Sequence, residues 1–227
     1  MLDTTLLLAF SFTSLLTTIP GVVAQCPQTA GYLGAFDSFT GDFIGAVSRN
    51  FPPPIAVSGT FTLDRTSNTS NYLAVFPFTN STNEGDAALL QILNPGDPNA
   101  PFVSLVIGIA DCTRNAFSNA LTSFAIIAAS DGFPHGALPI PGTTRTTFNG
   151  GYGNLGTFCG EPMALLVRSA FGRNVLAPVW TDPNGSQHPL FFVQDLTRDF
   201  LAATPDPDVY ASSNNVVVQE VNLAIFI

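Results

Sequence analysis

The chain has 227 residues, of which 46% are hydrophobic and only 10% are charged, and its formal net charge is −9. All seven basic residues are arginine, so the chain has few cations with which to neutralise phosphates, and neither nucleic acid nor an anionic membrane is an expected partner. The 20 phenylalanines supply far more apolar surface than a disordered chain carries, which predicts a folded protein.

The first 24 residues have the pattern of a secretory signal peptide. Residues 6–16 form a short apolar run, and Val22 and Ala24 are small residues of the kind that a signal peptidase recognises. Threonine and serine interrupt the stretch, whereas a membrane anchor needs about 20 continuous apolar residues. We therefore expect cleavage after Ala24 and an extracellular mature chain that begins at Gln25.

An N-terminal extended segment is expected at residues 25–54, followed by a single β-rich domain at residues 55–227. Runs rich in Val, Ile, Phe and Thr favour pleated strands, and 18 prolines and 19 glycines punctuate them. Strands are expected at residues 55–63, 71–78, 87–93, 102–110, 124–129, 143–148, 163–171, 175–180, 190–194 and 215–227. The pattern predicts a mainly β fold, an antiparallel sandwich or barrel.

Two segments have the features of short helices. Apolar residues recur with a 3.6-residue period in residues 111–124, and Asp111 is a good N-cap. Residues 195–203 begin with Asp-Leu-Thr-Arg-Asp and are followed by prolines that end helices. The segment Asp206-Pro207-Asp208 is expected to form a rigid acidic turn, because two carboxylates are too few ligands for calcium.

The two predicted helices belong to a repeated pattern. Residues 97–117 and 182–200 each contain Asp-Pro-Asn, a proline, an apolar run, Asp-x-Thr-Arg and a phenylalanine, in the same order. Upstream, Gly-Asp-Ala-Ala-Leu-Leu is echoed by Gly-Glu-Pro-Met-Ala-Leu-Leu. We therefore predict two similar halves made by tandem duplication, at residues 85–130 and 160–227.

Glycosylation and disulfide formation are expected in the secretory pathway. Three Asn-x-Ser/Thr sequons lie in polar, turn-rich stretches that can accommodate a bulky glycan. They begin at Asn68, Asn80 and Asn184.

The three cysteines allow one disulfide and one remaining thiol. We expect Cys112 to pair with Cys159, because both flank predicted core strands while Cys26 lies near a chain end. The alternative is that Cys26 attaches the N-terminal segment to the domain.

Paired carboxylates are the best enzymatic candidates. Glycoside cleavage uses two carboxyl groups about 5–9.5 Å apart. Glu84 and Glu161 precede the matching Ala-Leu-Leu runs, so a pseudo-twofold axis between the halves would let them face each other. The alternative is that both are solvated loop carboxylates.

Other catalytic motifs are weak or missing from the sequence. There is no Gly-x-Ser-x-Gly elbow, and the Gly-x-Gly-x-x-Gly match at residues 151–156 does not open a helix. The isolated His135 and His188 and the scattered cysteines have no metal-ligand spacing. We therefore expect neither a cofactor nor a metal site.

A carbohydrate-binding site is the main alternative to an enzyme. Trp180, the only tryptophan, ends a predicted strand next to a turn, where an exposed ring could stack on a sugar while Asn184 and Gln187 donate and accept hydrogen bonds. The competing interpretation is that Trp180 anchors the core.

The sequence thus favours a secreted, non-enzymatic glycoprotein of the extracellular space or cell wall that binds carbohydrate or a cell-wall polymer. The alternative function is a hydrolase or lyase acting on polysaccharide with Glu161 and Glu84. No motif indicates a known family, and the sequence does not decide between the two functions or indicate an oligomeric state.

Overall fold

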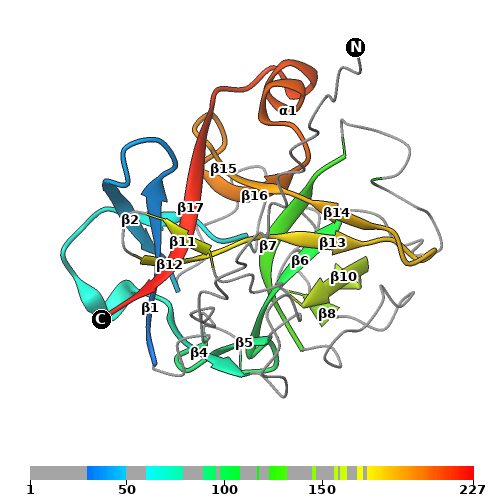
Figure 1. Ribbon diagram of the computed structural model, residues 1–227. Coiled ribbons are helices and arrows are strands. Elements are labelled where there is room, and N and C mark those ends of the chain that lie inside the picture. The colour runs from blue at the N-terminus through cyan, green and yellow to red at the C-terminus, as the bar shows by residue number, and fades with distance from the viewer. Residues whose placement is uncertain are drawn as a thin grey trace, which may run out of the picture.

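The computed structural model describes residues 30–49, 60–78, 89–95, 98–107, 117, 123–131, 145–146, 156–157, 159–162, 168–170 and 173–227. Eight strands form a closed antiparallel barrel, and pairing between β1 and β17 completes the ring (Figure 1). In order around the barrel they are β1 (Gly31–Asp37), β4 (Ala74–Phe78), β5 (Leu89–Ile92), β6 (Phe102–Ile107), β7 (Ala125–Ser130), β16 (Phe200–Thr204), β15 (Phe191–Asp195) and β17 (Val218–Phe226). The expected mainly β, antiparallel architecture is confirmed as a barrel.

Additional strands extend the barrel sheet. β2 pairs with β1 and β3, β12 joins β17 to β11, β10 pairs with β6, and β8 joins β7 to β9. β13 and β14 form a separate hairpin. The bounds of these strands are β2 (Phe43–Val47), β3 (Leu63–Asp64), β8 (Arg145–Thr146), β9 (Gly156–Thr157), β10 (Cys159–Pro162), β11 (Arg168–Ala170), β12 (Arg173–Leu176), β13 (Val179–Thr181) and β14 (Gln187–Pro189).

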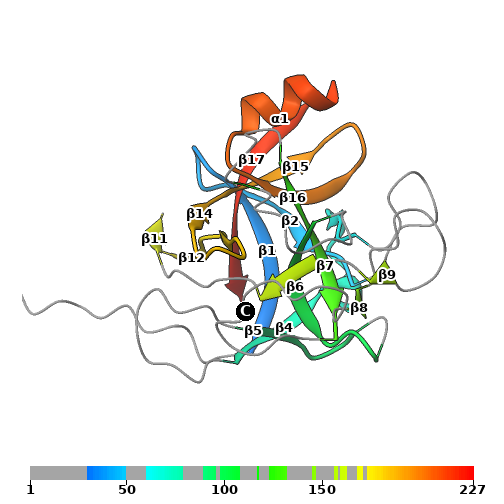
Figure 2. The same ribbon diagram turned by 90° about the vertical axis from the view of Figure 1, so that its right-hand side faces the viewer.

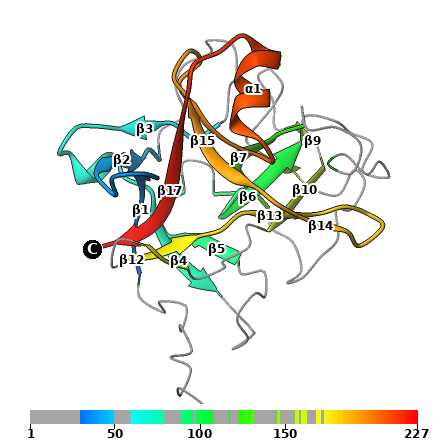
Figure 3. The ribbon, with the colours of Figure 1, turned by 45° about the horizontal axis from the view of Figure 1, so that its top comes forward.

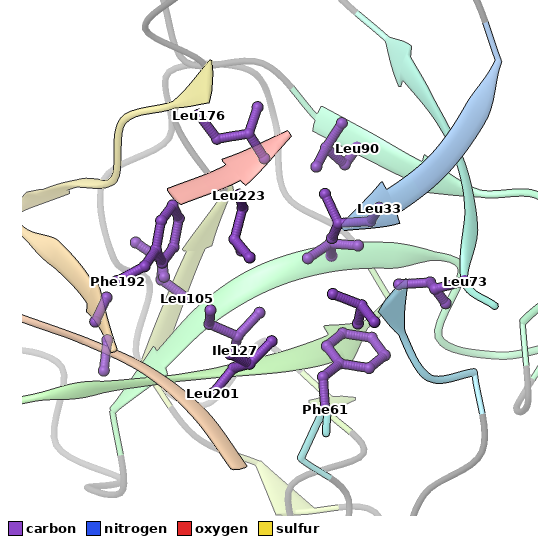
Figure 4. Close-up of a cluster of buried hydrophobic side chains, with 14 of the residues drawn as sticks. Leu33, Phe61, Leu73, Leu90, Leu105, Ile127, Leu176, Phe192, Leu201 and Leu223 are labelled. Carbon is purple, nitrogen blue, oxygen red and sulfur yellow. The ribbon is translucent and has the colours of Figure 1, made fainter. Parts of the chain in front are cut away.

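Apolar side chains fill the barrel interior. Alternate residues of each strand point inward, and Leu33, Leu105 and Ile127 are completely buried there (Figure 4). An eight-stranded barrel has an interior just wide enough for side chains. Each fully buried leucine or isoleucine contributes about 1.5–3 kcal/mol to folding, so the interior is a hydrophobic core and a ligand site is to be sought on the outside.

A short segment around Phe61 lies between β7 and β16 and forms hydrogen bonds with both strands. The N–H of Phe61 donates to the carbonyl of Ile127 at 3.2 Å, and the carbonyl of Phe61 accepts the N–H of Leu201 at 2.9 Å. The carbonyl of the next residue, Thr62, accepts the N–H of Ser48 at 2.9 Å, which links this segment to the residue that follows β2. The Phe61 side chain is completely buried and joins the interior core.

One α-helix, α1 (Pro207–Asn214), occurs among the described residues, and it was not one of the two that the sequence predicted. The carboxylate of Asp206 accepts the N–H groups of Asp208 and Val209 at 3.0 Å, and Pro207 suits the first helical position. The expected acidic turn is therefore the start of a helix. α1 lies beside β15 and β16, away from β4 and β5 (Figure 2).

Tyr210 fixes α1 to the barrel. Its side chain is completely buried, its hydroxyl donates to Asp195 Oδ2 at 3.1 Å, and its ring meets Phe124 edge-on at 5.0 Å. Arg198 lies 3.9 Å from the same carboxylate oxygen. Burial, followed by the negative charge of Asp195, raises the pKa of the Tyr210 hydroxyl above its ordinary value of 10.0.

The prediction of a helix at residues 195–203 is wrong, because Asp195 ends β15, residues 196–199 form a turn and residues 200–203 belong to β16. Asp195 Oδ1 accepts the N–H groups of Thr197 and Arg198, each at 2.9 Å, and Asp199 adopts a left-handed conformation with φ of 53°. A carboxylate makes the same hydrogen bonds at a helix N-cap and in a tight turn, so the local pattern did not distinguish them.

The N-terminal boundary also differs from the expectation. Residues 25–54 were expected to be an extended segment outside the domain, yet β1 and β2 lie within them, and six residues of β1 pair with β17. Figure 3 shows β17 running from beside α1 to the C-terminus next to β1. The domain therefore includes β1 as a barrel strand.

The remaining expectations about organisation stay predictions. Most of the predicted helix at residues 111–124 and much of the first proposed half lie outside the described residues. In the second half, the Asp-Pro-Asn element forms the β13–β14 turn, and the duplication itself remains a prediction. Among the described residues, no helix has the length and apolar character needed to span a membrane.

Candidate functional site

Five aromatic rings gather on the outer surface of β1, β2 and β17, and we call this cluster the aromatic face. Its members are Tyr32, Phe36, Phe43, Tyr72 and Phe226. Phe226 is the centre, because its ring centroid lies 5.3–6.5 Å from those of the other four rings. Such distances and tilted or edge-on geometries are favourable for aromatic pairs, so the cluster is a packed unit.

Strand alternation explains why these rings lie together. In β1, Leu33 and Ala35 belong to the interior core, so Tyr32 and Phe36 point to the outside. In β17, Leu223 faces the interior, and Phe226 lies on the other face, opposite Tyr32 in the register.

Gly34 provides the space over which two of the rings pack. A Cβ atom on Gly34 would lie 2.8 Å from two ring carbons of Phe226 and 3.1 Å from a ring carbon of Phe43. These distances are shorter than ordinary carbon–carbon contacts, so any larger residue would displace the rings. The glycine thus holds the rings close to the backbone of β1.

Part of the aromatic face is accessible to a ligand. The Phe43 side chain is 48% exposed, and Tyr32 and Phe226 are partly exposed. Phe36 and Tyr72 are buried and pack against the more exposed rings. On the adjoining β1–β2 turn, Phe39 is 80% exposed. An exposed ring set into a rigid sheet can pack against an apolar surface of a ligand.

A rigid turn borders the aromatic face. Asp37 Oδ1 accepts the N–H groups of Thr40 and Phe39 at 2.8 and 2.9 Å, and Oδ2 accepts an amide N–H of Gln219 at 2.9 Å. Chiefly because of the Thr40 N–H, then of Gln219 and Phe39, the pKa of the Asp37 carboxyl lies below its ordinary value of 3.8. The neighbouring Asp42 is exposed, so the turn offers hydrogen-bonding groups beside the rings.

The structure corrects the expected role of Trp180. Its side chain is only 1% exposed, and its ring lies 5.4 Å from that of Phe117 within the interior core. It therefore cannot stack on a sugar, and the core-anchor interpretation is the right one. Asn184 and Gln187 are exposed on the same hairpin but have no accessible ring between them.

A buried carboxylate joins Trp180 to one of the two histidines. Asp182 is completely buried and accepts a hydrogen bond from Trp180 Nε1 at 3.1 Å. His188 Nε2 lies 3.0 Å from the other oxygen of the same carboxylate, and the His188 side chain is 23% exposed. The backbone N–H of Phe117 reaches the carboxylate at 3.4 Å. In the sequence, Asp182 belongs to the Asp-Pro-Asn element, and no local pattern links it with His188.

The remaining site predictions lie wholly or partly outside the described residues. Glu84, Cys112 and Asn80 are not described. The backbones of Glu161 and Cys159 belong to β10, which pairs with β6, but their side chains are not described. The paired carboxylates and the Cys112–Cys159 disulfide therefore remain predictions.

Two of the three predicted glycosylation sites are described and exposed, Asn68 and Asn184. Asn68 Oδ1 accepts the N–H and the hydroxyl of Ser70 at 3.2 and 2.7 Å. Asn184 Oδ1 accepts the N–H of Ser186 at 2.9 Å. Both asparagines thus occur in turns at the surface, as the sequence analysis expected for their surroundings.

The sequence contains one signal for the aromatic face. In Gly-Tyr-Leu-Gly-Ala-Phe-Asp, residues 31–37, aromatic and glycine residues occupy one strand face while leucine and alanine occupy the other. That alternation indicates an outward aromatic surface within residues that were expected to form an extended N-terminal segment. The contributions of Phe226 and Tyr72 depend on pairing between distant strands.

Comparison with known proteins adds no assignment to this site, since no family model, curated protein or solved structure matches the chain. Among the described residues, no group of three or more His, Cys, Asp or Glu side chains is arranged to hold a metal ion.

Proposed function

We propose that this chain is a secreted, non-enzymatic glycoprotein that binds a neutral carbohydrate, such as a cell-wall polymer, through the aromatic face. The observation that carries the proposal is the packing of the accessible rings of Phe43 and Phe226 over Gly34 on a rigid sheet, with the partly exposed Tyr32 ring beside that of Phe226. This surface replaces the Trp180 hairpin as the candidate binding site.

The chemistry of aromatic rings supports a carbohydrate ligand. A pyranose ring has one face made of C–H groups, and these carry a small positive charge that suits the negative face of an aromatic ring. The hydroxyl groups at the sugar's edge need hydrogen-bonding partners, and the Asp37–Asp42 turn lies next to the rings. A net charge of −9 disfavours anionic polymers, so a neutral polymer is the proposed ligand.

The barrel holds the rings of the aromatic face in place before a ligand binds. The Phe226 ring contacts four other rings and lies directly over the backbone of Gly34. The Phe226 side chain therefore has little conformational freedom left to lose when a ligand binds. Ordering a rotamer-rich side chain costs about 0.5–1.5 kcal/mol at an interface, so prepacked rings retain more of their contact energy.

The test is binding of purified protein to insoluble chitin, cellulose and β-1,3-glucan, with Phe43→Ala as the variant. Phe191→Ala is the matched control, because Phe191 is 46% exposed, close to the 48% of Phe43, and makes none of the ring contacts of the aromatic face. The expected result is binding to at least one polymer that Phe43→Ala weakens about fivefold or more, or ~1 kcal/mol, while Phe191→Ala does not. Absence of binding to all three polymers, or equal binding by Phe43→Ala, would contradict the proposal.

A second candidate function is cleavage of polysaccharide by a hydrolase or lyase. The predicted pair for it is Glu161 with Glu84, and the contact between Asp182 and His188 is the described observation that favours acid–base chemistry. The complete burial of Asp182 and its bond from Trp180 favour a structural role for this contact instead. Release of new reducing ends by the wild type, abolished in Glu161→Gln or His188→Gln, would support cleavage.

A further inference from the structure

We infer that the glycan predicted at Asn68 is an intramolecular ligand of the aromatic face, which it covers and thereby regulates. The inference rests on the proposed function, because it assigns to the same rings a tethered sugar that competes with external carbohydrate. It depends on the geometry of the Asn68 turn, on the position of Tyr72, and on the exposure of the outer rings.

The Asn68 side chain is held in a position suited to carrying a glycan. Its Oδ1 atom accepts both the N–H and the hydroxyl of Ser70, and it caps the 3-10 turn Thr69–Asn71. A glycan is attached through Nδ2, so these Oδ1 hydrogen bonds persist after modification. The attachment point is therefore fixed relative to the residues that follow it.

The formation of this linkage is a group transfer from a lipid-linked oligosaccharide. The Nδ2 atom of Asn68 forms a bond to the anomeric carbon of the oligosaccharide and loses one proton. The bond from that carbon to the lipid diphosphate breaks, and the lipid diphosphate leaves with the electron pair. No oxidant or reductant takes part.

Hydrogen bonds connect the Asn68 turn directly to the aromatic face. The N–H of Tyr72 donates to the carbonyl of Thr69 at 3.1 Å, and the Tyr72 hydroxyl donates to the carbonyl of Thr66. The residues on both sides of Asn68 are thus tied to one ring of the aromatic face. That ring lies 5.6 Å from Tyr32 and 6.2 Å from Phe226.

The accessible rings lie just beyond Tyr72. Tyr72 itself is only 6% exposed, whereas the neighbouring Tyr32 and Phe226 are partly exposed and Phe43 is 48% exposed, so these three are the rings that we infer the sugars on Asn68 contact. A short flexible tether holds its ligand at an effective concentration on the order of millimolar. A tethered sugar therefore competes well with free sugars that bind aromatic surfaces weakly.

The second described sequon provides a contrast. Asn184 lies at the tip of the β13–β14 hairpin, where its Oδ1 accepts the N–H of Ser186. Trp180 in this hairpin and Leu190 directly after it belong to the interior core, whereas the aromatic face lies outside the barrel. A glycan on Asn184 is therefore the control for one on Asn68.

The experiment compares glycosylated wild type with Asn68→Gln and Ser70→Ala, which both remove the sequon. Ser70→Ala keeps Asn68 itself, so agreement between the two variants assigns an effect to the glycan and not to the lost side chain. Mass spectrometry of the wild type is expected to show a glycan at Asn68, and an unmodified Asn68 would overturn the inference. Affinity for the best polysaccharide is expected to rise threefold or more in both variants and to stay unchanged in Asn184→Gln. Equal affinity of wild type and both variants would overturn the inference while leaving the proposed function intact.

A second readout keeps the inference independent of the external ligand. Thermal unfolding of wild type, Phe43→Ala, Asn68→Gln and the double variant forms a cycle. If the glycan packs on the rings, Phe43→Ala lowers the melting temperature more with the glycan present than without it. Such coupling without binding to any polysaccharide would support the tethered glycan and contradict the proposed function. Additive effects would overturn the tethered glycan.

Discussion

Trp180 donates a hydrogen bond from its indole Nε1 to the carboxylate of Asp182 at 3.1 Å, within a hairpin that packs into the barrel core. The only tryptophan of the chain is thus hydrogen-bonded to a completely buried carboxyl group, which the imidazole of His188 also contacts. Burying a carboxylate is costly unless it is hydrogen-bonded, so this network stabilises the hairpin only when all its donors are present.

Asp182→Asn is expected to lower the free energy of unfolding by about 1–3 kcal/mol, because a neutral amide cannot accept hydrogen bonds from Trp180 and His188 with both of its polar atoms. Urea unfolding followed by the fluorescence of the single tryptophan measures the change. Asp42→Asn is the control, since Asp42 is exposed. Equal changes in the free energy of unfolding for Asp182→Asn and Asp42→Asn would show that the buried network does not contribute to stability.

Gly34→Ala tests the packing of the aromatic face. The added methyl group would lie 2.8 Å from ring carbons of Phe226 and would displace them, at a cost of about 1–3 kcal/mol in stability and with weaker polysaccharide binding. Gly185→Ala is the contrasting variant, because nothing lies within 4 Å of its added Cβ but its φ of +85° is strained for alanine. Both variants should lose stability in thermal melts, and only Gly34→Ala should lose binding. Unaltered binding by Gly34→Ala would contradict this account of the site.

Asp37 predicts a dependence of stability on acidic pH. Its folded pKa is lowered below the ordinary 3.8, so its contribution is present above about pH 4 and is lost as the pH falls through the folded pKa. The difference in melting temperature between wild type and Asp37→Asn should be constant from neutral pH to about pH 5 and shrink below about pH 4. A difference that stays the same in strong acid would exclude this linkage.

Tyr210 predicts the opposite dependence in alkali. Its folded pKa is raised above 10.0 by burial and by Asp195, so its contribution to stability is present below about pH 10 and is lost as the pH rises. Tyr210→Phe should be less stable near neutral pH, by about 0.5–1.5 kcal/mol for the lost hydrogen bond, and should lose less stability above about pH 10. Chemical unfolding at several alkaline pH values measures both effects, and parallel curves for the two proteins would contradict the prediction.

Local patterns predicted strands well and helices poorly. The runs that became β6, β7, β15 and β17 are rich in residues that suit a sheet, and their positions follow from composition and alternation. The error at residues 195–203 arose because the carboxylate of Asp195 makes the same bonds in a turn as at a helix start. Conversely, the pattern at Asp206 and Pro207 predicts a turn, whereas Asp206 caps the start of α1 and Pro207 is its first residue.

Local sequence patterns did not predict the candidate site, for a different reason. The sequence left Trp180 as either an exposed stacking ring or a core anchor, because a strand end next to a turn can face solvent or fold onto the core, and the structure shows that this hairpin folds onto the core. The aromatic face combines β1 with β17, nearly the full length of the chain apart. No feature within a short window indicates that Tyr32 and Phe226 will lie opposite each other.

The sequence by itself determined the mainly β class, the outward and inward faces of individual strands and the exposed setting of Asn68 and Asn184, because these depend on the nature of neighbouring residues. Only the tertiary structure decided which strands close the barrel, that Trp180 is buried against Asp182, and that the rings of Phe43 and Phe226, from two different strands, meet over Gly34 of a third. Pairing between distant strands and the packing of side chains are set by the free energy of the whole fold, which no local segment contains.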